Sequence, residues 1–536
     1  MIIVIGLSLI NAVLLCLVAY KLVHIYQLGG YRNRPFIKWV FDRENGFFTR
    51  LIALTLLGFG GMFIVNVVFK NFVDVGYLAH IGFAFYFLLA VFLCRSIFQQ
   101  KAKIGLKFTA RVKRLYMVMF LLIFGLSFFA MWAGSFCPWI QFSFVTGVAL
   151  ILPFCVIMAS WVLFPVEAWI RGFYIKRAKK KLFSEQYKNL IRVGVTGSYG
   201  KTSCKNILAK MLAKKYTVAS SPSSYNTPLG FSLTVNNILD EHEVFVFEMG
   251  LRYRRDIKYL AQLFRPMHGV LTGIGTQHIE TMRTVENIKN EKAELLRALP
   301  TDGIAVLNGE SEKCVELFSE LELENKFLVS VTDGDNVFAS VQDIKMSAEG
   351  CEFEMTMGGE VVKCKTKLLG KHNIQNILMC GAMAYKLGVS LGLIAEAVGE
   401  LEAIPHRLEM VKSGNGIIIL DDSYNASEDG IRAALEVLSF FDGKKVVQTP
   451  GLVEQGKFGY DANFKIGQMI ADIADEVIVV NELNKDALIN GLKDAGFENT
   501  KIHFVSSLDG AKELYAKLLS KGDVLLISND LPDNFK

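Results

Sequence analysis

The sequence predicts a multi-domain protein: an α-helical membrane domain of about five spans, an α/β domain, and a smaller, Rossmann-like α/β domain. Two observations support this. The long apolar stretches of the 536-residue chain are confined to its first 165 residues. Beyond them, short apolar strands alternate with helical patterns, first as far as 402 and again from 416 to 528. We expect domains at 1–183, 184–402 and 403–536.

Composition narrows the functional classes. Hydrophobic residues make up 52% of the chain, which is high for a soluble protein. The net charge of +6 is modest, and much of the Lys and Arg lies between or just after the apolar stretches, so we expect no nucleic-acid partner. The nine cysteines are scattered without a Cys-x-x-Cys pair, so neither a zinc site nor a disulfide framework is expected.

Five apolar stretches are long enough, at about 20 residues each, to cross a bilayer as helices. The first lacks the basic segment and cleavage site of a signal peptide, so we keep it as a span. No stretch carries a run of acids, bases or histidines of the kind that marks an ion pathway, and His80 is the only histidine inside them. The five stretches are roughly 2–22, 51–69, 77–97, 115–134 and 140–165.

The charge of the connecting segments predicts orientation. Basic residues crowd every second connection, at about 32–50, 101–114 and 171–181, whereas the alternate connections are short and nearly uncharged. Because basic loops stay in the cytoplasm, the N-terminus should lie outside and everything after 170 inside. We therefore expect a multi-pass protein of the inner, or cytoplasmic, membrane with its later domains in the cytoplasm.

A glycine-rich turn follows the first expected strand of the second domain. Ile191–Thr196 reads as a short buried strand, Gly197-Ser-Tyr-Gly200-Lys201-Thr202-Ser203 follows, and residues 204–214 read as a helix. Strand, turn, Lys-Thr and helix form a phosphate-binding loop, which makes this a P-loop ATPase domain. The spacing departs from G-x-x-x-x-G-K-[ST] because residue 195 is valine, so a chance Gly-Lys-Thr turn is the alternative. The ATP-binding candidates here are Gly197, Ser198, Gly200, Lys201, Thr202 and Ser203.

An acidic residue ends the strand that should lie beside this loop. Val244-Phe-Val-Phe-Glu248 is an apolar run closed by a carboxylate, and Gly250 follows. A carboxylate at the carboxyl end of a parallel strand, next to a phosphate loop, is well placed to bind magnesium together with the Thr202 hydroxyl. The alternative is a strand-end acid that faces solvent.

Several segments resemble the Mur ligases, in the order that this family uses. The loop Thr196-Gly-Ser-Tyr-Gly-Lys-Thr202 is similar to the family's Thr-Gly-x-x-Gly-Lys-[Thr/Ser]. The resemblance covers roughly 190–536, is nearest to the D-alanyl-D-alanine-adding branch, and leaves the spans where that branch has a UDP-binding domain. The other matching segments include Ser224-Tyr-Asn226-Thr-Pro-Leu-Gly230, Gln277-His278-Ile-Glu280, Gly370-Lys-His372-Asn373-Ile-Gln-Asn376, Pro405-His406-Arg407 and Asp421-Asp422-Ser-Tyr424-Asn425-Ala.

The resemblance implies roles for individual residues. Lys201, His278 and Lys292 would be catalytic. Asn373, Arg407 and Asp422 would complete the ATP site, and Asn226, Tyr424 and Asn425 would bind substrate. Thr202, Glu248, His278 and Lys292 would bind Mg²⁺, with Lys292 carbamylated; an ordinary surface lysine is the alternative for Lys292.

The resemblance also implies an activity, an ATP-dependent carboxylate–amine ligase acting through an acyl phosphate in cell-wall or cell-surface polymer synthesis. ATP and Mg²⁺ would be its cofactors. Its partners would be the lipid bilayer, a lipid-linked or UDP-linked muropeptide carboxylate, and an amino-acid or dipeptide amine. Two alternatives stay open: a poly-γ-glutamate-type synthetase of a different polymer, and a non-catalytic ATP-binding membrane sensor or scaffold.

Overall fold

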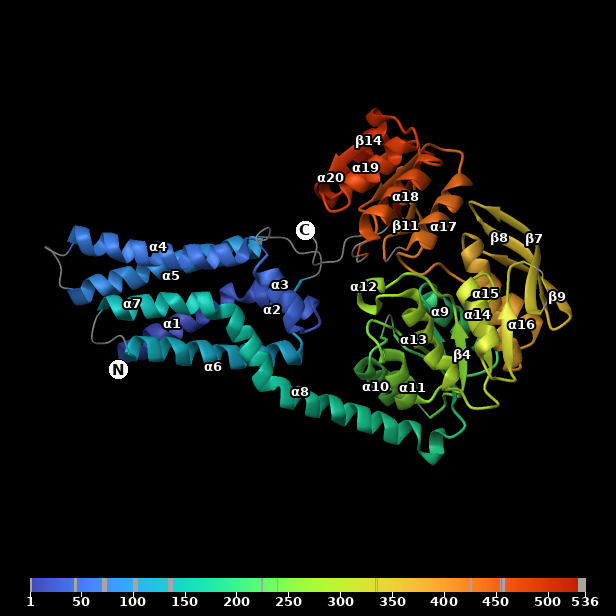
Figure 1. The fold of residues 1–536 in the computed structure, drawn as a ribbon, viewed down its shortest axis with the longest axis horizontal. Helices are drawn as coiled ribbons and strands as arrows, with labels where there is room; N and C mark the ends of the chain where they lie inside the picture. The colour runs from blue at the N-terminus through green and yellow to red at the C-terminus, as the bar shows by residue number, and fades with distance from the viewer. Residues whose placement is uncertain are drawn as a thin grey trace. The chain divides into compact units, whose positions relative to one another are not determined.

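A computed structural model shows how the chain folds (Figure 1). The chain divides into two compact units, Met1–Gly172 and Phe173–Leu531, each of which is described by itself. The helical first part thus separates from the α/β parts, while the boundaries at 183 and 402 stay predictions. The structure describes residues 2–42, 46–69, 75–99, 105–133, 138–222, 225–238, 240–332, 334, 336–424, 427–453, 455 and 458–528.

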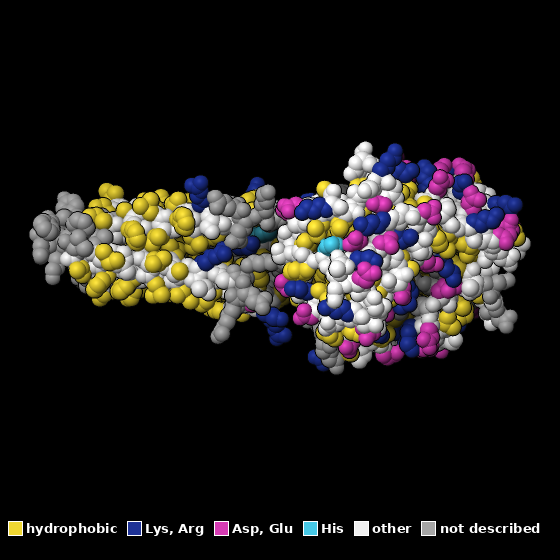
Figure 2. Space-filling model, turned by 90° about the horizontal axis from the view of Figure 1, so that it is seen from above, with side chains coloured by type: hydrophobic (Ala, Val, Ile, Leu, Met, Phe, Trp, Pro, Cys, Tyr) yellow, Lys and Arg dark blue, Asp and Glu magenta, His cyan; other side chains and the backbone are white. Residues whose placement is uncertain are grey.

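The first unit is built from helices. Its apolar side chains face both inward and outward, so hydrophobic atoms cover much of its surface, whereas Lys and Arg gather toward one end (Figure 2). The helices are α1 (Ile2–Val18), α2 (Tyr20–Leu28), α3 (Asn33–Val40), α4 (Phe47–Phe69), α5 (Val75–Gln99), α6 (Ala110–Ala133), α7 (Pro138–Gly147), the 3₁₀ turn η1 (Val148–Ile151) and α8 (Leu152–Leu182), whose last turns belong to the second unit.

Within the described residues, fewer helices are both long and apolar enough to span a membrane than the five expected. In the described residues two are long and apolar enough, Ala110–Ala133 and the 43-residue stretch Ile140–Leu182. A third is reached if α1 and α2, bent by 42°, form one span. The second and third expected spans fall on α4 and α5, in which the apolar portions found among the described residues are Phe47–Gly61 and Ile81–Ile97. Membrane crossing and orientation therefore remain predictions.

The second unit begins with a nine-stranded sheet in the order β2-β3-β1-β4-β5-β6-β7-β8-β9. The first six strands are parallel, as expected of a doubly wound domain. Strands β8 and β9 form an antiparallel hairpin that turns at Gly358 and Gly359, and β7 adds a third antiparallel strand. The strands are β1 (Ile191–Thr196), β2 (Val218–Ser220), β3 (Val244–Glu248), β4 (His268–Leu271), β5 (Ala305–Asn308), β6 (Lys326–Val329), β7 (Val337–Ser347), β8 (Gly350–Met357) and β9 (Glu360–Thr366).

Helices cover both faces of this sheet. One core joins α9, α15 and α16 to the sheet through residues such as Val193 and Ile377, and the other joins α10, α11, α13 and α14 through residues such as Phe247 and Leu295. Because β3, β1 and β4 are parallel neighbours, their carboxyl ends lie together at one edge of the sheet. The helices are η2 (Glu185–Tyr187), α9 (Lys201–Leu212), α10 (Pro228–Asn236), α11 (Asp256–Phe264), α12 (Ile279–Met282), α13 (Val285–Arg297), α14 (Glu312–Glu320), α15 (Lys371–Lys386) and α16 (Leu391–Gly399).

A six-stranded sheet in the order β10-β11-β15-β12-β13-β14 completes the unit. Only β10 is antiparallel, and the alternation of strand and helix predicted this repeat. The strands are β10 (Glu409–Lys412), β11 (Ile418–Asp422), β12 (Lys445–Thr449), β13 (Glu476–Val480), β14 (Ile502–Val505) and β15 (Val524–Ser528). The helices are α17 (Glu428–Ser439), α18 (Gly459–Ala471), α19 (Lys485–Asp494), η4 (Asn499–Lys501) and α20 (Leu508–Leu518).

Candidate active site

The loop between β1 and α9 has the backbone that a phosphate cradle requires. Gly200 adopts a φ of 72°, in the left-handed region that favours glycine. A Cβ at Gly200 would lie 2.8 Å from Asn376 Oδ1, and a Cβ at Gly197 would overlap Thr272 Oγ1. Both positions therefore require glycine, and the loop leads directly into the N-terminus of α9, where backbone N–H groups favour anions.

Lys201 is the first residue of α9, and its side chain folds back over the loop. Its Nζ donates to the Gly197 carbonyl oxygen at 2.8 Å and to Gln277 Oε1 at 3.4 Å. Burial lowers the pKa of Lys201 to about 8, which Glu248 opposes and Arg407 reinforces. Charged phosphate oxygens would stabilise this ammonium far better than its present neutral acceptors do.

Thr202 and Glu248 form an oxygen pair beside the loop. Thr202 Oγ1 donates to Glu248 Oε2 at 2.8 Å. Glu248 is only 2% exposed, so its interpretation as a solvent-facing acid is wrong. Within the described residues no group of three or more His, Cys, Asp or Glu side chains could hold a metal. Magnesium commonly takes one or two carboxylates and fills its shell with phosphate and water, so this pair fits Mg²⁺.

His278 lies on the same edge, at the start of α12. Its backbone adopts a left-handed φ of 65°, a conformation that is uncommon outside glycine and that is enriched at functional sites. Burial lowers the pKa of its imidazole to about 4, and the positive charges of Lys201 and Lys292 push in the same direction. A neutral imidazole can bind a metal ion through an unprotonated ring nitrogen.

Lys292 lies on α13 and is 1% exposed, so its interpretation as a surface lysine is wrong. Burial, reinforced by Lys201, lowers the pKa of Lys292 well below its usual value. The neutral amine is the form that can add carbon dioxide, and the resulting carbamate would be an anion facing Lys201 and His278. The surroundings of Lys292 therefore suit a carbamate better than an ammonium.

A cavity of about 300 Å³ lies between the loop and the second sheet. Asn373, Arg407 and Asp422 all line it, together with Gly200 and Ser203 of the loop. Asn373 is fixed by a bond from its Nδ2 to the Leu369 carbonyl oxygen at 2.9 Å. Burial raises the pKa of Asp422 to about 7, although Arg407 opposes the shift. A nucleoside attached to phosphates in the loop would enter this cavity.

A second cavity, of about 240 Å³, opens on the other side of the loop. Lys201, Glu248 and His278 line it together with Asn226 and Tyr424, two of the predicted substrate-binding residues. Arg407 lines both cavities, and its guanidinium lies 4.4 Å from the centre of the Tyr424 ring. Asn425, the third predicted substrate-binding residue, lies outside the described residues.

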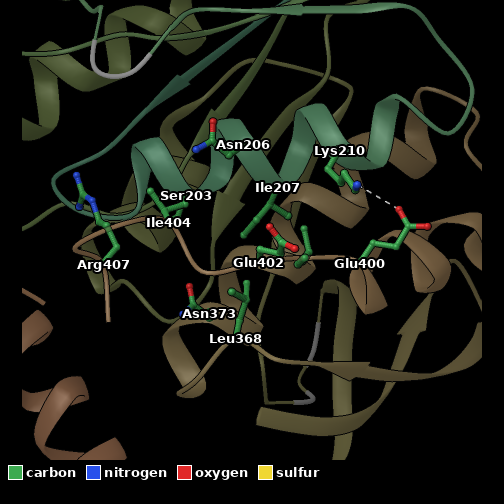
Figure 3. A pocket seen from close by; sticks show the side chains of 11 residues that line it. Ser203, Asn206, Ile207, Lys210, Leu368, Asn373, Glu400, Glu402, Ile404 and Arg407 are labelled. Carbon is green, nitrogen blue, oxygen red and sulfur yellow. Dashed lines mark ion pairs between the residues drawn. The ribbon is translucent and has the colours of Figure 1, made fainter. Parts of the chain in front are cut away.

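A third cavity, of about 280 Å³, follows the flank of α9 (Figure 3). Ser203, Asn206, Ile207 and Lys210 face it from α9, and the linker between the two sheets closes it with Glu400, Glu402 and Ile404. Lys210 Nζ pairs with Glu400 at 3.3 Å. Ser203, Asn373 and Arg407 line both this cavity and the cavity of about 300 Å³, so the linker lies next to the candidate ATP site.

Sequence reasoning missed several residues of this site. Asn308 ends β5, donates to the Thr272 carbonyl oxygen at 2.8 Å and accepts from Gln375 Nε2 at 2.8 Å. Its signal was available, because a polar residue closes a buried strand there as Glu248 does in β3. The sequence carried no signal for Lys205, because a lysine in a helix normally faces water. In the structure it is 1% exposed and donates to the Ser221 carbonyl oxygen at 2.6 Å.

Two family domains match the α/β part of the chain. Residues 195–384 match the Mur ligase middle domain, and residues 406–529 match the Mur ligase glutamate ligase domain. The UDP-N-acetylmuramoyl-tripeptide–D-alanyl-D-alanine ligase of Bacillus subtilis is 28% identical over 337 residues, covering 62% of this chain and 72% of that protein. The ligase of the same name from Escherichia coli is 26% identical over 276 residues, covering 52% and 61%.

Solved structures agree with this assignment of the fold. MurF ligase from Thermotoga maritima, in complex with ADP, aligns with a TM-score of 0.60 at 25% identity, covering 67% of this chain and 80% of that one. MurF from Acinetobacter baumannii aligns with a TM-score of 0.60 at 22% identity, covering 67% and 77%.

Proposed function

Because the chain belongs to the Mur ligase family and is an ATP-dependent carboxylate–amine ligase, we propose that it extends a peptidoglycan precursor while anchored in the cytoplasmic membrane. The edge formed by β1, β3 and β4 carries this proposal. There Lys201, the Thr202–Glu248 pair and His278 line one cavity with Asn226 and Tyr424, and Lys292 lies behind them as a neighbour of Lys201 and His278.

The reaction takes two steps. A carboxylate oxygen of the acceptor attacks the γ-phosphorus of ATP, ADP leaves, and an acyl phosphate forms. The amine then attacks the acyl carbon, the C–O bond to phosphate breaks, and the nitrogen loses a proton to give an amide and inorganic phosphate. Both steps gather negative charge on oxygens, so electrostatic stabilisation should supply most of the acceleration.

The residues of the site would divide this work. Lys201 would move from the Gly197 carbonyl to the β- and γ-phosphates and neutralise the charge that develops on them. Asp422, at the end of β11, and Arg407, just before β10, would hold the nucleoside side of ATP, and Asn373 would fix the base. Closure of the second sheet over the first would exclude the water that hydrolyses an acyl phosphate.

Thr202, Glu248, His278 and a carbamylated Lys292 would hold magnesium, which supplies Lewis-acid stabilisation of the phosphate oxygens and of the attacking carboxylate. The buried, low-pKa Lys292 supports this assignment, because a buried ammonium next to Lys201 would repel the metal.

The acceptor that we propose is lipid-linked. The apolar helices preceding the ligase domains support it, because an anchored enzyme meets membrane-bound substrates at a high effective concentration. The amine that we propose is D-alanyl-D-alanine, after the names of the relatives.

The test uses the full chain in nanodiscs with ATP and Mg²⁺, and it measures amide product with a polyprenyl-linked or a UDP-linked muropeptide. The proposal expects a much higher rate with the lipid-linked acceptor, and equal rates would reject it. Replacing D-alanyl-D-alanine by glutamate separates this function from poly-γ-glutamate synthesis. A scaffold would form no amide with any pair.

A further inference from the structure

The outward face of α10 carries apolar side chains that the α/β fold leaves uncovered. Leu229 and Leu233 lie one turn apart on α10, and Tyr225 lies in the loop before the helix, close to Gly230. All three are more than a third exposed, whereas Phe231 and Val235, on the other side of the helix, are fully buried. A surface helix normally presents polar side chains to water, so this stripe indicates a partner.

Three arginines border the stripe. Arg252, Arg254 and Arg255 are all exposed, in the turn between β3 and α11. The turn lies beside the stripe, because the Asn226 side chain, next to Tyr225, packs closely against Gly250. An apolar strip edged by guanidinium groups is complementary to a surface that offers phosphates above hydrocarbon.

The other end of α10 is attached to the helix that leaves the apolar part of the chain. Lys181, in the last turn of α8, donates from Nζ to the carbonyl oxygen of Asn236 at 3.1 Å and to that of Ile238. Helix α8 runs without a break from Leu152 to Leu182, from an apolar beginning to a basic end. The nine residues of α10 therefore bridge about 14 Å between this attachment and the cavity lined by Asn226.

We propose that this face, formed by Tyr225, Leu229, Leu233, Arg252, Arg254 and Arg255, rests on the anionic surface of a lipid bilayer. The leucines and the tyrosine enter the interface, and the arginines contact lipid phosphates. The proposal rests on the membrane anchoring of the proposed function and deepens it. It places the mouth of the 240 Å³ cavity beside the headgroups, where a lipid-linked carboxylate arrives without leaving the membrane.

The test labels Leu233→Cys with bimane in the full chain, reconstituted in nanodiscs that contain a headgroup-region doxyl lipid quencher. A matched control is Val361→Cys, an apolar position on β9 that is 61% exposed. We expect strong quenching at position 233 with phosphatidylglycerol present, and little with phosphatidylcholine alone or at position 361. High salt, or Arg254→Glu combined with Arg255→Glu, should abolish it. Equal quenching at 233 and 361 overturns the proposal.

Two controls keep the outcome decisive. The chain without an added cysteine is labelled in parallel to subtract its own thiols, and Leu229→Cys replaces Leu233→Cys if that variant does not fold. If alkaline carbonate extracts the chain from vesicles, membrane anchoring fails and docking fails with it. If the chain stays embedded and forms amide while position 233 is unquenched, docking alone is rejected.

Discussion

The helical unit and the α/β unit both bury polar side chains, but they treat them differently. In the helical unit the buried Asn11 donates from Nδ2 to Ser127 Oγ at 2.9 Å, and the partly buried Arg114 pairs with Glu167 at 2.6 Å. In the α/β unit burial lowers the pKa values of both Lys201 and Lys292, and the charge of Lys201 lowers that of Lys292 further. Pairing of this kind maintains a fold, whereas crowded like charges cost stability and mark a place prepared for an anionic ligand.

The sharpest test of this contrast is Lys201→Ala. Because the Lys201 ammonium lies over the phosphate-binding loop, its loss should lower turnover by about 10²–10³-fold or more, with the fold intact. The measurement is amide formation by the reconstituted chain. Lys188→Ala is the control, since that lysine is 64% exposed just before β1 and should leave the rate unchanged. Equal rates for the two variants would break the comparison.

Two lysines on one helix repeat the contrast within α13. Lys289 contacts Glu286, Glu316 and Glu320, and its hydrogen bonds to Glu320 and Glu286 raise its pKa, whereas burial lowers the pKa of Lys292. We expect Lys292→Ala to lower turnover about 10–100-fold, and added acetate to restore part of it by replacing the carbamate.

Lys289→Ala should instead keep its turnover and lose about 1 kcal/mol of stability, since the carboxylates around it are partly exposed. Urea denaturation and steady-state rates of both variants decide the matter. A reversed pattern, with turnover lost at Lys289, would contradict the account.

Asp422 should show that the site lowers stability. Its pKa rises from 3.8 to about 7 on folding, so the folded state binds more protons than the unfolded state between these values. Stability is therefore greatest below pH 4 for this group and falls as pH rises toward 7. Asp422→Asn should stabilise the nucleotide-free chain above pH 7 by about 1–2 kcal/mol, a discounted figure because the side chain is only half-buried.

Thermal unfolding of wild type and Asp422→Asn at pH 4.5 and pH 8 measures this difference. It should shrink at the lower pH, and nucleotide affinity should fall in the variant. A variant less stable than wild type at pH 8 would show that the carboxylate is paired, as in the helical unit.

The smallest effect belongs to the helical unit. Asn11→Ala removes a buried hydrogen bond between α1 and α6 and should cost about 0.6 kcal/mol, the usual scale inside membrane bundles. Turnover should not change. Thermal unfolding in nanodiscs and the ligation rate measure the two quantities. A lost rate in a fully folded variant would mean that the helices take part in the reaction.

The sequence predicted the two α/β sheets and the phosphate-binding loop because each depends on residues that are adjacent in the chain. A buried strand followed by glycines and Lys-Thr, or ended by Glu248, has few structural interpretations. Lys205 and Asn308 depend on what folds against them, so nothing adjacent in the chain marked Lys205, and Asn308 needed the sheet order to be noticed.

In the helical part, composition predicted the apolar stretches but not where the helices end or what their ends contact. Five apolar stretches were expected from length, yet the last of them continues into a helix that ends at Leu182. The basic end of α8 was assigned to a connecting segment, whereas it packs on α10 through Lys181. Hydropathy identifies the apolar run, but it cannot predict a contact between residues 55 positions apart in the chain.

The central claim is that a carboxyl group becomes an acyl phosphate before the amide forms. An acceptor whose terminal carboxylate carries ¹⁸O tests it directly, by mass spectrometry of the inorganic phosphate released by the reconstituted chain. The account predicts one ¹⁸O atom in the phosphate for every amide made from a doubly labelled carboxylate. Phosphate released without ¹⁸O, while amide accumulates, would contradict it.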